Sequence, residues 1–132
     1  MTNVVLDADI FIDYLKGKSK NFLFLVKKVR ENEIKLFIPT AVLVEIFVGS
    51  EFLQSQILKD AQKLLREIQS VPLTEEIAFL AAEIGREKKL GFLGTVDLVL
   101  AATTLTLDAQ VATHNVKHFK LLPQIEIFDF PA

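Results

Sequence analysis

The sequence VVLDADIFIDYLKG, residues 4–17, changes from a strand pattern to a helix pattern within a few residues. Its first three residues form a short apolar run, which is typical of a buried strand. Two acids, Asp7 and Asp9, follow closely, and residues 10–16 then carry a helical pattern that ends at Gly17, a common type of helix terminator. The stretch therefore predicts a buried strand, an acidic turn and a helix.

Strand and helix patterns continue to alternate along the rest of the chain. We expect further strands at residues 36–38, around Val71, at 110–113 and at 126–128. We expect helices across 22–29, from an N-cap at Thr40 to Val48, across 52–68, from a cap at Thr74 to about Lys89, and across 96–107, with breaks at Gly91 and Gly94. Strands separated by helices predict an α/β fold with a short parallel sheet flanked by helices, in one domain over residues 1–132.

The composition excludes several classes of protein. Because the chain contains no cysteine, it has neither disulfides nor thiolate metal sites, and we expect a cytoplasmic protein. The longest apolar stretch, residues 92–107, contains Asp97 and is too short to cross a membrane. The mean hydropathy of +0.37 is high for a small chain, which predicts that an oligomer or a tight partner covers apolar surface.

The charge pattern does not by itself indicate a nucleic-acid-binding protein. The net charge of −2 gives no overall attraction to RNA or DNA. Local basic groups would have to guide a nucleic acid, although each is more often a solvated helix end: Lys16, Lys18 and Lys20; Lys27, Lys28 and Arg30; Arg86, Lys88 and Lys89. Three aromatic side chains are within possible reach of a nucleotide, although core or interface packing is their commoner use: Phe11, Tyr14 and Phe92.

Asp7 comes directly after the first predicted strand. Ligands of open parallel sheets bind outside the carboxyl ends of the strands, which is where this carboxylate is expected. The alternative is that Asp7 or Asp9 only caps the helix that follows, because acids are favourable in a first helical turn. This segment alone does not separate the two interpretations.

Two further acids stand in apolar surroundings. Glu45 lies within an otherwise apolar predicted helix, and Asp97 lies among aliphatic residues after a glycine-bearing turn. A buried carboxylate needs a cation, a partner or water, because burying it unpaired costs several kcal/mol. The alternatives are that Glu45 faces solvent and that Asp97 only favours the dipole of its helix.

The occurrence of three acids, Asp7, Glu45 and Asp97, in apolar stretches of sequence is better explained by one shared site than by three independent causes. Carboxylates are hard oxygen ligands suited to Mg²⁺ or Mn²⁺, and the scarcity of histidine argues against a zinc site. Hard metal ions in turn suit phosphate chemistry. The residues thus predict a metal site that handles a phosphate.

Four segments together resemble the signature blocks of PIN-domain proteins, in the family order. They are LDADIFIDYLKG at 6–17, IPTAVLVEI at 38–46, GTVDLVLAA at 94–102 and ATHNVKHF at 112–119. The resemblance spans essentially the whole chain, and the size of the chain is similar to that of VapC-type toxins of toxin-antitoxin pairs.

The resemblance implies a PIN-like fold and a Mg²⁺- or Mn²⁺-dependent endoribonuclease. Asp7, Glu45 and Asp97 match the acidic catalytic and metal-binding positions of the family, and Thr113 matches a supporting hydroxyl residue. We place Asp9 and Asn115 among the supporting residues. The fourth block departs from the family pattern, because neither Asn115 nor His118 is an acid, so a second metal is in question.

The resemblance also implies an RNA substrate, a cognate antitoxin and a homodimer. A housekeeping RNA-processing nuclease and a catalytically inactive RNA-binding domain fit the same blocks. A phosphoacceptor domain of the response-regulator type also places acids after a first parallel strand, but Glu45 within an apolar helix makes that alternative less attractive.

Overall fold

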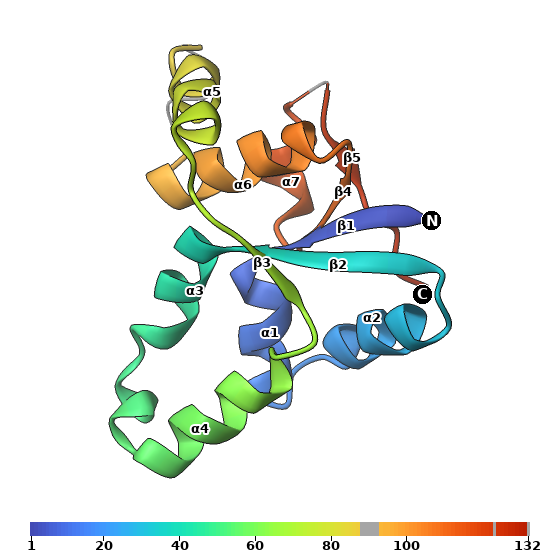
Figure 1. The fold of residues 1–132 in the computed structure, drawn as a ribbon, viewed down its shortest axis with the longest axis vertical. Helices are drawn as coiled ribbons and strands as arrows, with labels where there is room; N and C mark the ends of the chain where they lie inside the picture. Colours follow the sequence, from blue (N-terminus) through green and yellow to red (C-terminus); the bar gives the residue numbers. More distant parts are fainter. Residues whose placement is uncertain (88–92, 123, 132) are drawn as a thin grey trace.

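The computed structural model describes residues 1–87, 93–122 and 124–131. Strands and helices alternate along the chain as predicted (Figure 1). The elements are β1 Thr2–Leu6, α1 Ala8–Leu15, α2 Asn21–Arg30, β2 Ile34–Pro39, α3 Thr40–Phe47, the 3-10 helix η1 Ser50–Leu53, α4 Ser55–Leu64, β3 Gln69–Val71, α5 Glu75–Gly85, α6 Thr95–Thr106, β4 Gln110–Ala112, α7 Val116–Phe119 and β5 Glu126–Ile127.

The five strands form one sheet in the order β3-β2-β1-β4-β5. All neighbouring strands are parallel, so their carboxyl ends lie at the same edge of the sheet. After β1 the chain crosses to β2 on one side, whereas β4 and β5 lie on the other side. The strand order reverses between β1 and β4, so the carboxyl ends of these two strands are where a ligand crevice is expected in such a sheet.

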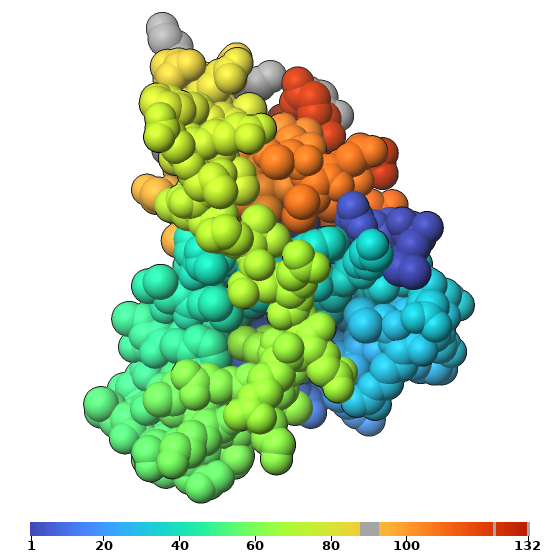
Figure 2. Space-filling model, in the orientation of Figure 1, coloured from blue at the N-terminus to red at the C-terminus, as the bar shows by residue number. Residues whose placement is uncertain are grey.

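Helices cover both faces of the sheet. In Figure 1, α1, α2 and α4 lie below the strands, and α5 and α6 lie above them. The central strand β1 is apolar on both sides, because Val4, Val5 and Leu6 are all fully buried. Figure 2 shows the segment from β3 to α5 running over the surface between the two groups of helices. The core thus holds β1, and the residue at its end, in one fixed position.

Several predicted element boundaries are confirmed. Gly17 ends the first helical segment with a φ of +72°, a conformation that favours glycine. The hydroxyl of Thr74 caps α5 by accepting a hydrogen bond from the Ile77 backbone N–H at 3.2 Å. The helix begins as expected and ends at Gly85, and its predicted extension to Lys89 and the break at Gly91 lie outside the described residues.

Two predicted helices differ from the structure. Pro39, and not Thr40, occupies the N-cap position of α3, and the Thr40 hydroxyl instead accepts a hydrogen bond from the Leu73 backbone N–H at 3.3 Å. The single helix expected across residues 52–68 is divided into η1 and α4 at Gln54, whose backbone is extended. The break lets Phe52 pack against Phe47, with ring centroids 4.9 Å apart. Burial of this ring outweighs continuation of the helix.

The short helix α7 was not predicted from the sequence. Among the described residues, no helix is long and apolar enough to cross a membrane.

Candidate functional site

Asp7 is the buried centre of a group of acids at the carboxyl end of β1. Its side chain is 5% exposed, and its backbone N–H donates to the Ala112 carbonyl of β4 at 2.9 Å. Its Oδ1 accepts a hydrogen bond from the Ala8 backbone N–H at 2.7 Å, so Asp7 is also the N-cap of α1. The capping interpretation is therefore correct, and it does not exclude a role at the sheet edge.

Thr113 is the residue that fixes the second oxygen of Asp7. Its hydroxyl donates to Asp7 Oδ2 at 2.7 Å and accepts a hydrogen bond from the Asn115 backbone N–H at 3.0 Å. Thr113 is 2% exposed and follows β4 directly, instead of ending that strand as expected. The parallel pairing of β1 with β4 brings these two side chains together across the sheet edge.

Asp9 lies two residues after Asp7, in the first turn of α1, and is held by the same loop. Its two carboxylate oxygens accept from the His114 backbone N–H at 3.1 and 3.2 Å. The Thr113 hydroxyl also approaches Asp9 Oδ2 at 3.4 Å. The loop after β4 thus positions both acids that follow β1.

Glu45 and Asp97 reach the site from two other helices. Asp97 lies in the first turn of α6 and is half-buried, and α6 packs against α3. The expectation that Glu45 is buried is wrong, because this residue is exposed. Val42 and Ile46 form the buried side of α3, which leaves Glu45 at the rim of the crevice. The alternative in which Glu45 faces solvent is therefore confirmed.

The acids act on one another electrostatically. Burial first, and then Asp9 and Asp97, raise the pKa of Asp7 to about 7, against the lowering effect of its hydrogen bonds from Thr113 and Ala8. Partial loss of solvent, followed by the charges of Asp97 and Asp9, raises the pKa of Glu45. Burial also raises the pKa of Asp9. The three predicted acids and Asp9 therefore form one electrostatically connected group, the acidic cluster.

No lysine or arginine within the described ranges forms an ion pair with the acidic cluster. In the same part of the chain, no three His, Asp or Glu side chains are arranged as a ready-made metal cage. Burial is the first cause of the raised pKa values, and repulsion between the like charges of the cluster adds to it. A cation bound among these carboxylates would relieve that repulsion.

Three side chains around the site were missed from the sequence. His114 Nδ1 lies 2.7 Å from Asp13 Oδ2, and His114 Nε2 lies 3.0 Å from Asn21 Nδ2. Asp13 is one helical turn after Asp9, so its spacing in α1 was an available signal. The contact between Asn21 and His114 joins two segments that are far apart in the sequence, so no local sequence pattern predicts it.

The residues of the fourth block contact one another. Asn115 Nδ2 lies 2.7 Å from His118 Nδ1, so the two positions without an acid contact each other.

Of the aromatic residues considered for nucleotide contact, Phe11 and Tyr14 pack against Phe22, with ring centroids 4.9 and 5.3 Å apart. Phe92 lies outside the described residues.

We expect Thr113→Val to destabilise the protein by about 1–3 kcal/mol, because the buried Asp7 carboxylate loses a donor and the Asn115 N–H loses its acceptor. The free energy of unfolding in urea at pH 8 measures this change. Thr113→Ser keeps the hydroxyl and should retain most of the stability. Equal stability of the Val and Ser variants would show that the hydrogen bonds of Thr113 contribute little.

Comparisons with known proteins agree with this architecture. The family model of the PIN domain matches residues 4–123. Ribonuclease VapC from Rickettsia bellii is 27% identical over 135 residues, covering 97% of this chain and 96% of that protein. Ribonuclease VapC19 from Mycobacterium tuberculosis is 24% identical over 124 residues, covering 92% of this chain and 96% of that protein.

The fold is also similar to that of a solved toxin-antitoxin structure. A chain in the crystal structure of VapBC2 from Rickettsia felis, bound to a DNA fragment from their promoter, superposes with a TM-score of 0.82 at 18% identity. The match covers 98% of this chain and 100% of that chain. With the family match over residues 4–123, these observations establish that the chain belongs to the PIN-domain family.

Proposed function

We propose that this protein is a Mg²⁺- or Mn²⁺-dependent endoribonuclease and the toxin of a VapBC-type toxin-antitoxin pair. The observation that carries the proposal is the acidic cluster, which lies at the carboxyl edge of a PIN-domain sheet without an ion pair to a lysine or arginine among the described residues. The names of the relatives, ribonuclease VapC and VapC19, support the choice of RNA as substrate.

The donor atoms of the cluster suit a hard divalent cation. Each oxygen of Asp7 accepts one hydrogen bond, which leaves a further acceptor position on each. Mg²⁺ usually binds one or two carboxylates together with water and substrate phosphates, so a complete protein cage is not required. Asp7, Asp97 and Glu45 are the proposed metal ligands.

In this proposal the protein side chains hold the reacting groups and move a proton. A bound divalent cation would supply charge neutralisation at the phosphate and a more acidic water. Asp7 is kept in place by Thr113 and by the backbone of Ala8. Glu45, exposed at the rim with a raised pKa, is suited to accept a proton from the attacking water.

An antitoxin and a second copy of the chain are the proposed protein partners. Exposed apolar side chains continue from α3 through η1 to α4: Val44, Val48, Leu53, Ile57 and Leu64. A hollow of about 480 Å³ between α1 and α4 is lined by several apolar residues, including Ile12, Phe52 and Ile57. Apolar surface of this kind is typical of protein interfaces, which supports the expectation of partners.

The proposal is tested by incubating mixed cellular RNA with the purified protein in Mg²⁺, Mn²⁺ or EDTA. We expect discrete products with a metal, none in EDTA, and a loss of at least about a hundredfold in rate for Asp97→Asn, since charge stabilisation of several kcal/mol depends on the ligands. Asp108→Asn is the matched control, because Asp108 is exposed and precedes β4, away from the carboxyl edge.

Products that persist in EDTA, or in Asp97→Asn at the wild-type rate, would contradict the metal-dependent mechanism. The toxin role adds a second readout with the same variants. Expression of the wild-type chain and of Asp108→Asn should stop bacterial growth, whereas expression of Asp97→Asn should not.

A further inference from the structure

A second hollow lies next to the acidic cluster, between the loop after β4, helix α7 and the segment after β5. Its volume is about 550 Å³, within the range of small-ligand pockets. The polar and aromatic residues that line it are Thr113, His114, Lys120, Phe128, Asp129 and Phe130. The elements around it can be followed in Figure 1, where α7 and β5 lie on the same side of the sheet as the end of β4.

The hollow shares a wall with the acidic cluster. Thr113 lines it and donates a hydrogen bond to Asp7 at 2.7 Å. His114 also lines it, and its backbone N–H donates to Asp9. The hollow is therefore close enough to the acidic cluster to receive the residue next to a phosphate bound there.

The wall formed by His114 is held rigidly in place. His114 Nε2 lies 3.0 Å from Asn21 Nδ2, and His114 Nδ1 lies 2.7 Å from Asp13 Oδ2. Both ring nitrogens are thus engaged, which fixes the orientation of the ring. Its centroid lies 6.5 Å from that of Phe130, so the imidazole and the aromatic side of the hollow adjoin each other.

The side of the hollow next to His114 is aromatic. Phe128 and Phe130 pack edge to face with centroids 4.9 Å apart, and both rings also adjoin Phe24, at 6.2 and 6.1 Å. Both residues are only partly buried, so part of their ring surface remains open. Mutual packing holds these rings in position without filling the hollow.

We propose that this hollow binds an unpaired nucleobase of the RNA, on the nucleotide next to the phosphate at the acidic cluster. This inference rests on the proposed function. The base packs on Phe128 and Phe130, and the exposed ammonium group of Lys120 attracts the adjoining backbone. Aromatic side chains bind single-stranded RNA in this way because every base has a stacking face.

The test compares two probes with the metal-free protein in EDTA at low salt. One is a short unstructured oligoribonucleotide, and the other is a ribose-phosphate oligomer of the same length without bases. We expect the wild-type chain to prefer the base-bearing probe, and Phe128→Ala to weaken its binding by about 5- to 100-fold, because stacking contributes about 1–3 kcal/mol per base. The base-free probe should bind both proteins equally.

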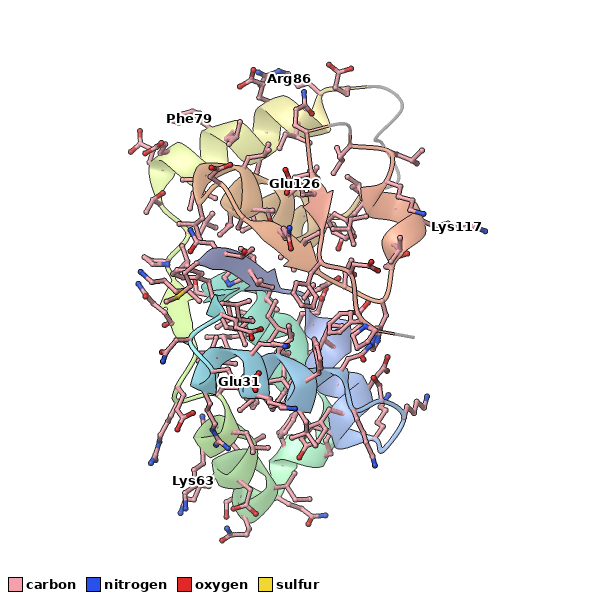
Figure 3. All side chains as sticks on the ribbon, turned by 90° about the vertical axis from the view of Figure 1, so that its right-hand side faces the viewer. Glu31, Lys63, Phe79, Arg86, Lys117 and Glu126 are labelled. Carbon is pink, nitrogen blue, oxygen red and sulfur yellow. The ribbon has the colours of Figure 1, made fainter. Side chains whose placement is uncertain are left out.

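The control variant is Phe79→Ala. Phe79 is 68% exposed on α5, on the opposite side of the molecule from Lys117 in Figure 3, and its removal should leave both affinities unchanged. Phe128→Leu keeps apolar volume but removes the stacking face, so it should show the same loss as Phe128→Ala. This second variant answers the question if Phe128→Ala does not fold.

Lys120 has a different expected signature from Phe128. The Lys120 side chain is proposed to attract the RNA backbone, which both probes contain. Lys120→Ala should therefore lower the affinity for both probes by the same factor and reduce the salt dependence of binding. Lys117→Ala is the matched control, because Lys117 extends outward from α7 in Figure 3 and does not line the hollow.

Two results would overturn the proposal. The first is that the wild-type chain binds both probes with the same affinity, as expected if the hollow receives a protein side chain. The second is that Phe128→Leu binds the base-bearing probe with wild-type affinity. The assay contains no metal, so it is independent of cleavage. Base-dependent binding through Phe128 without metal-dependent cleavage would contradict the proposed function alone, and cleavage without an effect of Phe128 would contradict only this inference.

Discussion

Asp7→Asn should lower the rate of metal-dependent RNA cleavage by at least about a hundredfold while the protein remains folded. The loss follows because Asp7 is the most buried acid of the cluster, and an amide carries no charge to bind a cation. The fold should persist because an amide is the same size as the carboxylate. Its oxygen can accept from Ala8, and its NH₂ group can donate to the Thr113 hydroxyl.

The measurement is single-turnover cleavage of an oligoribonucleotide that contains the preferred bond, with saturating Mn²⁺. Asp60→Asn is the matched control. Asp60 is an exposed acid on α4 that accepts a hydrogen bond from Gln56, and an asparagine oxygen can keep that contact. Cleavage by Asp7→Asn at more than a tenth of the wild-type rate would remove Asp7 from the proposed centre.

The sequence predicted the parts of the site that are encoded within single elements. Asp7 follows an apolar run, and a residue in that place must emerge at the carboxyl end of a strand. Asp97 follows a glycine and opens a helix, so its place in the first turn of α6 was also visible. Local periodicity carries this information because it depends only on residues close in the chain.

Periodicity failed for Glu45 for a physical reason. Helix α3 is apolar on both sides, with Val42 and Ile46 buried and Val44 and Val48 exposed. An exposed apolar face removes the contrast by which a helical pattern reveals which side faces the core. The same exposed valines are part of the surface proposed above for protein partners.

Contacts between distant segments could not be predicted from spacing. The hydroxyl of Thr113 and the carboxylate of Asp7 are 106 positions apart, and they meet because β4 pairs with β1. The aromatic hollow depends on the same pairing, followed by that of β5 with β4, which places Phe128 beside the loop that holds His114. The family resemblance supplied Thr113, but it did not supply His114, Phe128 or Phe130.

The metal-free protein should lose stability as the pH rises from 5 to 8, which is opposite to ordinary acid denaturation. Burial raises the pKa of Asp7 from 3.8 to about 7, so between these values the folded state holds a proton that the unfolded state has lost. Stability therefore falls as the pH rises through this window and levels off above it. The raised pKa values of Asp9 and Glu45 act in the same direction.

Between pH 5 and pH 8 the contribution of Asp7 is about 3 kcal/mol at most, because about two pH units of the gap between 3.8 and about 7 lie above pH 5, and a smaller value is expected because the cluster can relax and admit water. The check is the free energy of unfolding in urea at pH 5 and pH 8, for the wild type and for Asp7→Asn. Asp7→Asn cannot ionise, so its advantage in stability over the wild type should be larger at pH 8 than at pH 5. Equal stability of the two proteins at pH 8 would show that the Asp7 carboxylate ionises there without cost.

Mn²⁺ should reverse this order at pH 8. A cation that binds only the folded state stabilises it, and protons compete with the cation for the same carboxylates. The stabilisation of the wild type by Mn²⁺ should therefore be larger at pH 8 than at pH 5, and nearly absent in Asp7→Asn. The repulsion that destabilises the empty cluster is then the property that makes it a cation site. A Mn²⁺ effect that is equal at both pH values and in both proteins would place the bound metal elsewhere on the molecule.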